Sequence, residues 1–110
     1  MQLDEKLEIS ELNRVYGALL TPHQCEMLRL YYDCDISLNE LSDMYGISRQ
    51  AVRDALLRGV RALKEFEDKL ALIRLRRQRR STVTLITRLI KEGRCEQAVE
   101  ELGALYEEEE

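Results

Sequence analysis

The chain has 110 residues, of which 45% are hydrophobic, 35% are charged and 5% are aromatic. This length suits one domain with a modest core, or a small core with an extended helix. One proline, five glycines and no long alternating run of Val, Ile and Thr argue against a sheet, so the sequence predicts an all-α protein.

Charge is distributed unevenly along the chain, although the formal net charge is only −4. Residues 1–48 carry three basic and nine acidic side chains, residues 49–80 carry eleven and four, and residues 81–110 carry three and eight. A basic segment between acidic ones indicates nucleic-acid binding more sharply than the average charge does. The alternative is an exposed helix whose basic side chains pair with acidic neighbours.

The cysteines and the histidine do not predict a metal site. Cys25, Cys34 and Cys95 form no CxxC pair, and His23 has no ligand set near it. We therefore expect no metal, no cofactor and a reducing, cytoplasmic location. A catalytic triad would need His23, and the sequence has no Gly-rich phosphate loop or nucleophile elbow, so we expect no enzyme.

Membrane segments are not expected either. The N-terminus is acidic and amphipathic, unlike a signal peptide. No apolar run approaches the length that spans a bilayer, so we expect no membrane insertion.

Two helices are predicted in the first third of the chain. Apolar residues recur at three- and four-residue spacing over residues 3–20. Thr21 and Pro22 then provide the N-cap and first turn of a second helix that reaches about Asp33. The inner candidates of that helix are Cys25, Leu28, Tyr31 and Tyr32. We interpret the tyrosines as core residues rather than stacking platforms for bases.

A helix-turn-helix follows. Ser37 and Glu40 have the spacing of a capping box at the start of a short helix. Gly46 supplies the left-handed turn that ends this helix. Ile47 is expected to fill the corner between the helices, and Ser48 to cap the second one.

The second helix of this motif has an apolar side and a basic side. Val52, Ala55, Leu56 and Leu63 continue a period of about 3.6 residues. Side chains off this period suit the major groove, where arginine reads guanine and glutamine reads adenine. The DNA-binding candidates, of which the last two are expected on phosphates, are Ser48, Arg49, Gln50, Arg53, Asp54, Arg58 and Arg61. The alternative is an ordinary helical hairpin whose arginines only keep it soluble.

The second helix has no obvious end. No proline interrupts residues 49–80, and a continuous helix over this range would span about 48 Å. A heptad seam runs along it with a spacing of four and three residues. The seam consists of Val52, Leu56, Gly59, Leu63, Phe66, Leu70 and Ile73. Two interpretations stay open: the long helix forms a homodimer through this seam, or the chain's own first and last helices cover it.

The densest charge run lies at the end of this segment. It consists of Arg74, Arg76, Arg77, Arg79 and Arg80. We expect these arginines to contact phosphates of DNA or RNA, because counterion release favours a polyanion there. The alternative is an exposed helix end, where arginine is favourable without a ligand.

A helical hairpin is predicted after the arginine run. Ser81 or Thr82 would cap a helix that ends at Glu92–Gly93, and a last helix would follow. We interpret this pair as a lid or a protein-docking module, followed by an acidic tail that is expected to be disordered. The predicted domains are a helix-turn-helix domain (1–72), a basic extension with the hairpin (73–106) and the tail (107–110).

Two stretches carry a family resemblance. Residues 47–54 read ISRQAVRD and resemble the recognition helix of region 4 domains of bacterial sigma factors. Over roughly residues 7–72, blocks such as YGALLT, LYY and SRQAV resemble the YlxM family of small bacterial helix-turn-helix proteins. The departures are Ile36 and Arg53, where that family often has Tyr, and Leu57, which replaces a common Lys on the basic side.

The resemblance implies a DNA-binding or regulatory protein with a sigma-region-4-like helix-turn-helix. Gene neighbourhood in that family implies a link to the signal recognition particle pathway, and so to protein-targeting partners. The alternative is an RNA- or protein-interaction module that acts on the signal recognition particle or the ribosome without sequence-specific DNA binding. Duplex DNA is the first expected partner and RNA the second.

Overall fold

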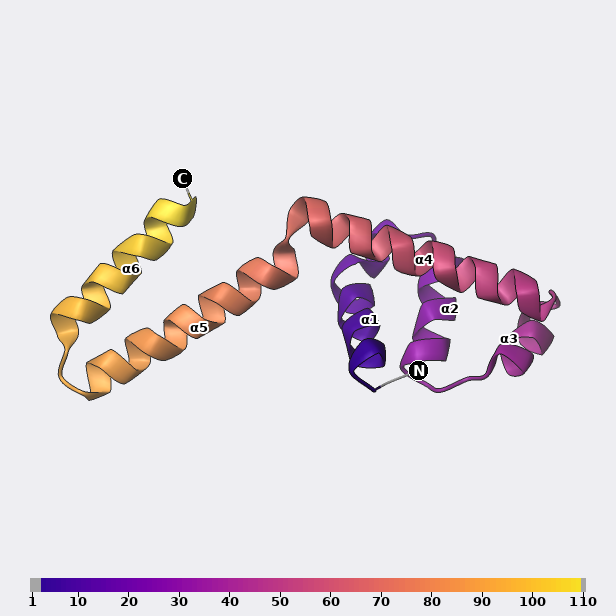
Figure 1. Cartoon of the computed structure of the whole chain (residues 1–110), viewed down its shortest axis with the longest axis horizontal. Helices are drawn as coiled ribbons and strands as arrows, with labels where there is room; N and C mark the ends of the chain where they lie inside the picture. The colour runs from indigo at the N-terminus through magenta and orange to yellow at the C-terminus, as the bar shows by residue number, and fades with distance from the viewer. Residues whose placement is uncertain (1–2, 110) are drawn as a thin grey trace. The chain divides into compact units, whose positions relative to one another are not determined.

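The computed structural model describes residues 3–109, with side chains up to residue 105, and is all-helical over this range (Figure 1). The chain divides after Ala71 into two compact units. The first unit contains α1 (Leu3–Tyr16), a 3₁₀ turn (Gly17–Leu19), α2 (Pro22–Tyr32), α3 (Leu38–Tyr45) and α4 (Arg49–Leu70). The second unit contains α5 (Leu72–Lys91) and α6 (Cys95–Glu109). The predicted all-α fold is confirmed.

The first unit is built around α4, which packs against α1, α2 and α3 (Figure 1). A Cβ atom on Gly59 would lie 2.9 Å from Leu28 Cδ1, so α2 and α4 approach each other closely at this glycine. Side chains from all four helices are buried in one core. They are Ile9, Leu12, Tyr16, Met27, Leu28, Leu41, Val52, Leu56 and Leu63.

Tyr16 connects α1 to the second half of α4. Its ring centroid lies 6.0 Å from that of Phe66, and its hydroxyl donates to Glu67 Oε1 at 2.6 Å. The ring is buried, so this tyrosine is a core residue, whereas Tyr31 and Tyr32 of α2 are half-buried. The contact fixes α4 well beyond the helix-turn-helix itself.

The predicted heptad seam is covered within the chain. Val52, Leu56, Gly59 and Leu63 are buried where α4 meets its neighbours in the same unit. The neighbours are α1, α2 and α3, so the first helix of the chain does cover this side of α4, as one of the two interpretations expected. A homodimer through these four residues would have to open the core of the first unit.

The continuous helix over residues 49–80 is not observed, because α4 ends at Leu70. Ala71 adopts a left-handed conformation with φ of 53°, and its N–H donates to the Glu67 carbonyl at 2.8 Å. Glycine usually occupies such a position, so the sequence carried no signal for this break. The seam therefore does not continue to Ile73, which belongs to α5.

The expected helix start at Ser81 or Thr82 is also wrong. Both residues lie inside α5, and the Thr82 hydroxyl donates to the Gln78 carbonyl at 3.0 Å instead of capping a new helix. The acidic tail is partly helical, because α6 continues to Glu109. Glu110 lies outside the described residues.

Local capping in the first unit follows the predictions. The Thr21 hydroxyl accepts from the Gln24 N–H at 3.1 Å, and the Gln24 side chain accepts from the Thr21 N–H, so a full capping box starts α2. The first helix ends earlier than the predicted residue 20, since a 3₁₀ turn begins at Gly17.

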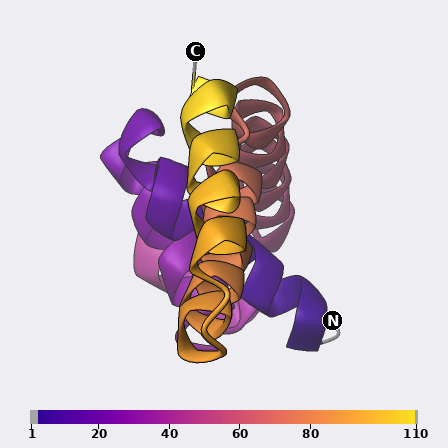
Figure 2. The same ribbon diagram turned by 90° about the vertical axis from the view of Figure 1, so that its left-hand side faces the viewer.

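In the second unit, α5 and α6 run antiparallel and pack against each other (Figures 1 and 2). Gly93, with φ of 78°, ends α5 where the sequence predicts a helix end. Ile86, Leu89 and Ala98 form the buried cluster between the two helices. Among the described residues, no helix is long and apolar enough to cross a membrane.

Candidate nucleic-acid interface

The turn between α3 and α4 is held by short side chains. Ser37 Oγ accepts from the Glu40 N–H at 3.1 Å at the start of α3, and Gly46 ends that helix with φ of 65°. Ser48 Oγ accepts from the Ala51 N–H at 3.0 Å and caps α4. The Ser42 hydroxyl donates to the carbonyl of the residue after Gly46, which connects α3 directly to the turn. These bonds fix the direction in which α4 leaves the turn.

Ile47 does not fill the corner between the two helices as predicted. Its side chain is 37% exposed, whereas Leu41 of α3 is fully buried. Leu41 therefore supplies the apolar contact between α3 and the core. This choice depends on how α3 packs against α2 and α4, which the local sequence pattern around the turn does not specify.

Replacing Gly46 with alanine should destabilise the first unit by about 1–2 kcal/mol, because a Cβ atom is unfavourable in the left-handed conformation. No atom lies within 4 Å of the added methyl group, so the cost is conformational and not steric. Gly46→Asn is the matched control, because asparagine tolerates this conformation better. Urea denaturation measures both variants, and an equal loss for alanine and asparagine would contradict this explanation.

The basic side of α4 is exposed along its first three turns. The structure places every predicted DNA-binding side chain on the surface. On the opposite side of the same helix, Val52, Leu56 and Leu63 are buried. The exposed set consists of Ser48, Arg49, Gln50, Arg53, Asp54, Arg58 and Arg61. The helix thus presents a row of polar side chains on a rigid base, as a major-groove helix does.

Two of these side chains bind each other. Gln50 Nε2 donates to Asp54 Oδ1 at 2.9 Å, one helical turn along α4. The Gln50 amide keeps its oxygen and its second hydrogen for other contacts, and Asp54 keeps its other oxygen. The pair therefore presents a donor and two acceptors in a fixed arrangement beside Arg53.

Leu57 lies within the exposed side of α4 and is 49% exposed. It stands seven residues after Gln50 and four before Arg61, so all three share one side of the helix. An apolar side chain at this place can contact a thymine methyl group. Leu57 departs from the family pattern in the sequence but is not one of the predicted site residues.

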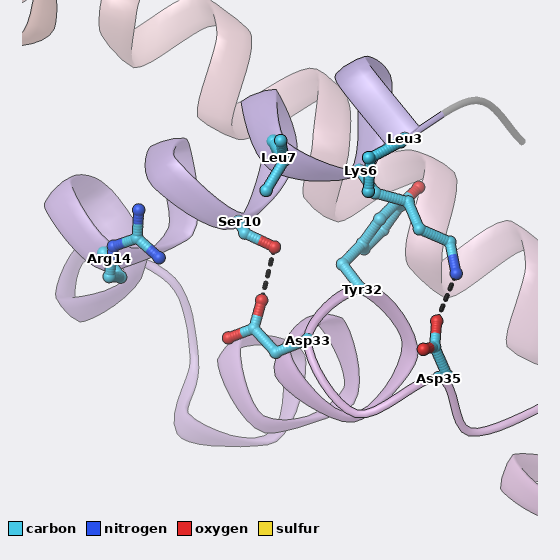
Figure 3. Close-up of a pocket in the computed structure, with 8 residues that line it drawn as sticks. All are labelled: Leu3, Lys6, Leu7, Ser10, Arg14, Tyr32, Asp33 and Asp35. Atoms are coloured by element: carbon cyan, nitrogen blue, oxygen red, sulfur yellow. Dashed lines mark hydrogen bonds and ion pairs between the residues drawn. The ribbon is translucent and has the colours of Figure 1, made fainter.

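The loop before α3 is attached to α1 by two polar contacts that the sequence did not predict (Figure 3). Ser10 donates to Asp33, and Lys6 forms an ion pair with Asp35. Asp35 is one of two non-glycine residues with positive φ among the described residues, at 56°. The contacts hold the chain in the conformation that leads into the helix-turn-helix.

A surface depression of about 510 Å³ surrounds these contacts (Figure 3). Tyr32 lines it, and partial burial raises the pKa of its phenol above the ordinary value. Four of its polar side chains bind one another in two pairs, Lys6 with Asp35 and Ser10 with Asp33, so we assign the depression a structural role in positioning the loop.

His23 lies exposed in the first turn of α2. Its ring centroid is 4.6 Å from that of Tyr45, so the imidazole packs beside the end of α3. Among the described residues, no group of three or more His, Cys, Asp or Glu side chains is placed to hold a metal ion.

The arginine run lies in the first half of α5, in the second unit. All of its members are exposed: Arg74, Arg76, Arg77, Arg79 and Arg80. The run therefore belongs to a different compact unit from the predicted base-reading residues.

Comparison with known proteins identifies the family to which this arrangement belongs. The model of the UPF0122 family, described as "Putative helix-turn-helix protein, YlxM / p13 like", matches residues 3–102. The chain belongs to the UPF0122 family. The resemblance to YlxM proteins seen in the sequence is thereby confirmed.

Curated UPF0122 proteins align over much of the chain. A relative from Fusobacterium nucleatum is 37% identical over 103 residues, covering 93% of this chain and 99% of the relative. A relative from Geobacillus kaustophilus is 38% identical over 106 residues, covering 96% and 94%. A relative from Desulforamulus reducens is 44% identical over 66 residues, and that match covers 60% of this chain and 56% of the relative. The family thus includes both compact units.

Proposed function

We propose that this protein is a DNA-binding regulator that inserts the first turns of α4 into the major groove of duplex DNA. One observation carries the proposal: α4 buries its apolar side in the core and exposes Arg49, Gln50 and Arg53 directly after a capped turn. The helix-turn-helix family fits this function. These residues suit binding rather than catalysis. The protein would act in the cytoplasm, where bacterial DNA lies.

The base-facing roles follow from the chemistry of each side chain. Arg49 and Arg53 can each donate two hydrogen bonds to guanine O6 and N7. Gln50 can accept from adenine N6 and donate to N7 with the hydrogen that does not bind Asp54. The second oxygen of Asp54 can accept from cytosine N4.

Contacts with DNA phosphates would fix the position of α4 along the duplex. Ser48 stands at the N-terminus of α4, where backbone N–H groups attract anions. Arg58 and Arg61 lie about three to four turns further along α4 and are exposed. They would bind phosphates and add affinity without sequence preference.

The arginine run of α5 favours a second candidate function. Five exposed arginines within seven residues suit phosphates of either DNA or folded RNA. In this alternative, Arg76 and Arg80 with their neighbours bind RNA of the signal recognition particle or a ribosomal surface, and the link to protein targeting follows. A-form RNA closes its major groove to a helix such as α4, so α4 would contribute little.

Fluorescence-anisotropy titrations at two salt concentrations separate the candidates. The probes are a duplex selected from a random pool, a random duplex and signal recognition particle RNA. We expect tightest binding to the selected duplex, with a dissociation constant that rises with salt. Preference for the RNA would support the second candidate, and absence of binding to all three probes would refute binding to duplex DNA and to signal recognition particle RNA.

A further inference from the structure

The hairpin of α5 and α6 leaves much of its apolar surface uncovered. Its buried cluster within the described residues is small, consisting of Ile86, Leu89 and Ala98. Four further apolar side chains are more than half exposed, which is a large apolar area for a two-helix unit. We call this set the hairpin face; it consists of Val83, Ile90, Val99 and Leu102.

These four side chains lie on one face of the hairpin. Leu89 of α5 and Ala98 of α6 are buried between the two helices. Ile90 and Val99 each follow one of them directly, so each points about 100° further round its own helix axis. Antiparallel helices turn in opposite senses when seen from one end, so equal turns bring both side chains to the same side. The other two members stand seven residues before Ile90 and three after Val99, and share that side.

The two edges of the hairpin face carry opposite charges. The outer edge on α5 carries Arg80 and Lys91, and the outer edge on α6 carries Glu96 and Glu100. Each is turned by a further 60–100°, or about a quarter turn, beyond an apolar residue of the face. All four charged side chains are exposed.

We propose that the hairpin face binds the same face of a second copy of this chain. One two-fold arrangement places α5 of each copy over α6 of the other, so the basic edge meets the acidic edge twice. The other arrangement places α5 over α5 and α6 over α6, and brings like charges together. Charge therefore selects the first arrangement, which is a four-helix bundle made from two hairpins.

Self-complementarity identifies the second copy as the occupant. The face has its apolar strip in the middle and opposite charges at its two edges, so an identical face matches it without any further partner. Apolar burial supplies the affinity, and the exposed charge pairs supply the orientation, because such pairs add little affinity by themselves. The dimer surface thus lies on the hairpin and not on the covered seam of α4.

Sedimentation velocity of the full chain without nucleic acid tests the interface. We expect the unchanged protein to be a dimer at micromolar concentration. Ile90→Ser combined with Val99→Ser should raise the dimer dissociation constant at least about tenfold. Met44→Ser, which alters an equally exposed apolar residue of α3, should leave it unchanged. A chain that stays monomeric throughout this range, or a double variant that dimerises normally, would overturn the proposal.

Charge reversal tests the arrangement. One variant carries Arg80→Glu and Lys91→Glu, and the other carries Glu96→Lys and Glu100→Lys. Each variant alone should dimerise weakly, because both edges of its hairpin face then carry the same sign of charge. An equal mixture of the two variants should form heterodimers, in which an acidic edge meets a basic edge on both sides. Misfolded variants could not restore each other, so recovery in the mixture supports the proposal. A mixture that associates no better than either variant alone contradicts it.

Discussion

Alanine at both Arg49 and Arg53 should strongly weaken the preference of this protein for its selected duplex, leaving only the part that Gln50 and Asp54 supply. Each arginine that reads a guanine contributes about 1–3 kcal/mol of discrimination, so loss of both should reduce specific affinity by at least tenfold, or roughly 1.4 kcal/mol. Binding to random duplex should fall much less, because it depends on phosphate contacts. Anisotropy titrations with both probes at one salt concentration measure the two effects.

The matched control uses the phosphate-facing arginines on the same helix. Alanine at both Arg58 and Arg61 should weaken binding to selected and random duplex equally, and should make the salt dependence shallower. All four side chains are exposed, so neither double variant should unfold the first unit. If Arg49→Ala/Arg53→Ala binds the selected duplex as tightly as the unchanged protein, the major-groove model is wrong.

The parts of this structure that follow local rules were predictable from the sequence. Thr21, Ser37 and Ser48 cap helices because a side-chain oxygen stands three residues before an N–H that has no helical partner. The apolar period of α4 predicted the buried side of that helix and therefore its exposed side. Even the Gln50–Asp54 bond follows a local spacing of four residues, although it was not among the predicted contacts.

The parts that depend on tertiary packing were not predictable. Ala71 adopts a left-handed conformation that a non-glycine residue rarely takes, and no neighbouring proline indicates the break. Lys6 and Asp35 form an ion pair between segments whose proximity the sequence does not specify. The heptad pattern of α4 fits a dimer seam and a buried core side equally well, and the choice depends on where α1 and α2 pack.

If the protein dimerises through the hairpin face and binds DNA through α4, its DNA target should reflect the two-fold symmetry of the dimer. A two-fold dimer carries two copies of α4, so sequences selected from a random pool should contain two inverted half-sites. The double variant Ile90→Ser/Val99→Ser should select a single half-site. If the double variant still selects two half-sites, the hairpin face is not the source of the two-fold symmetry. The proposed binding of α4 in the major groove would still stand.

Alanine at Leu63 should destabilise the first unit by about 2–5 kcal/mol, because removal of a fully buried leucine leaves a cavity among tightly packed neighbours. A domain of this size is stable by roughly 5–15 kcal/mol, so this variant should lie near its unfolding threshold. Leu57→Ala is the matched control on the same helix, and should change stability by no more than about 0.5 kcal/mol because Leu57 is half exposed. Urea denaturation followed by tyrosine fluorescence reports mainly on the first unit, which contains four of the five tyrosines of the chain. Equal losses for Leu57→Ala and Leu63→Ala would mean that α4 does not bury the side assigned here, and the exposed base-reading side would lose its structural basis.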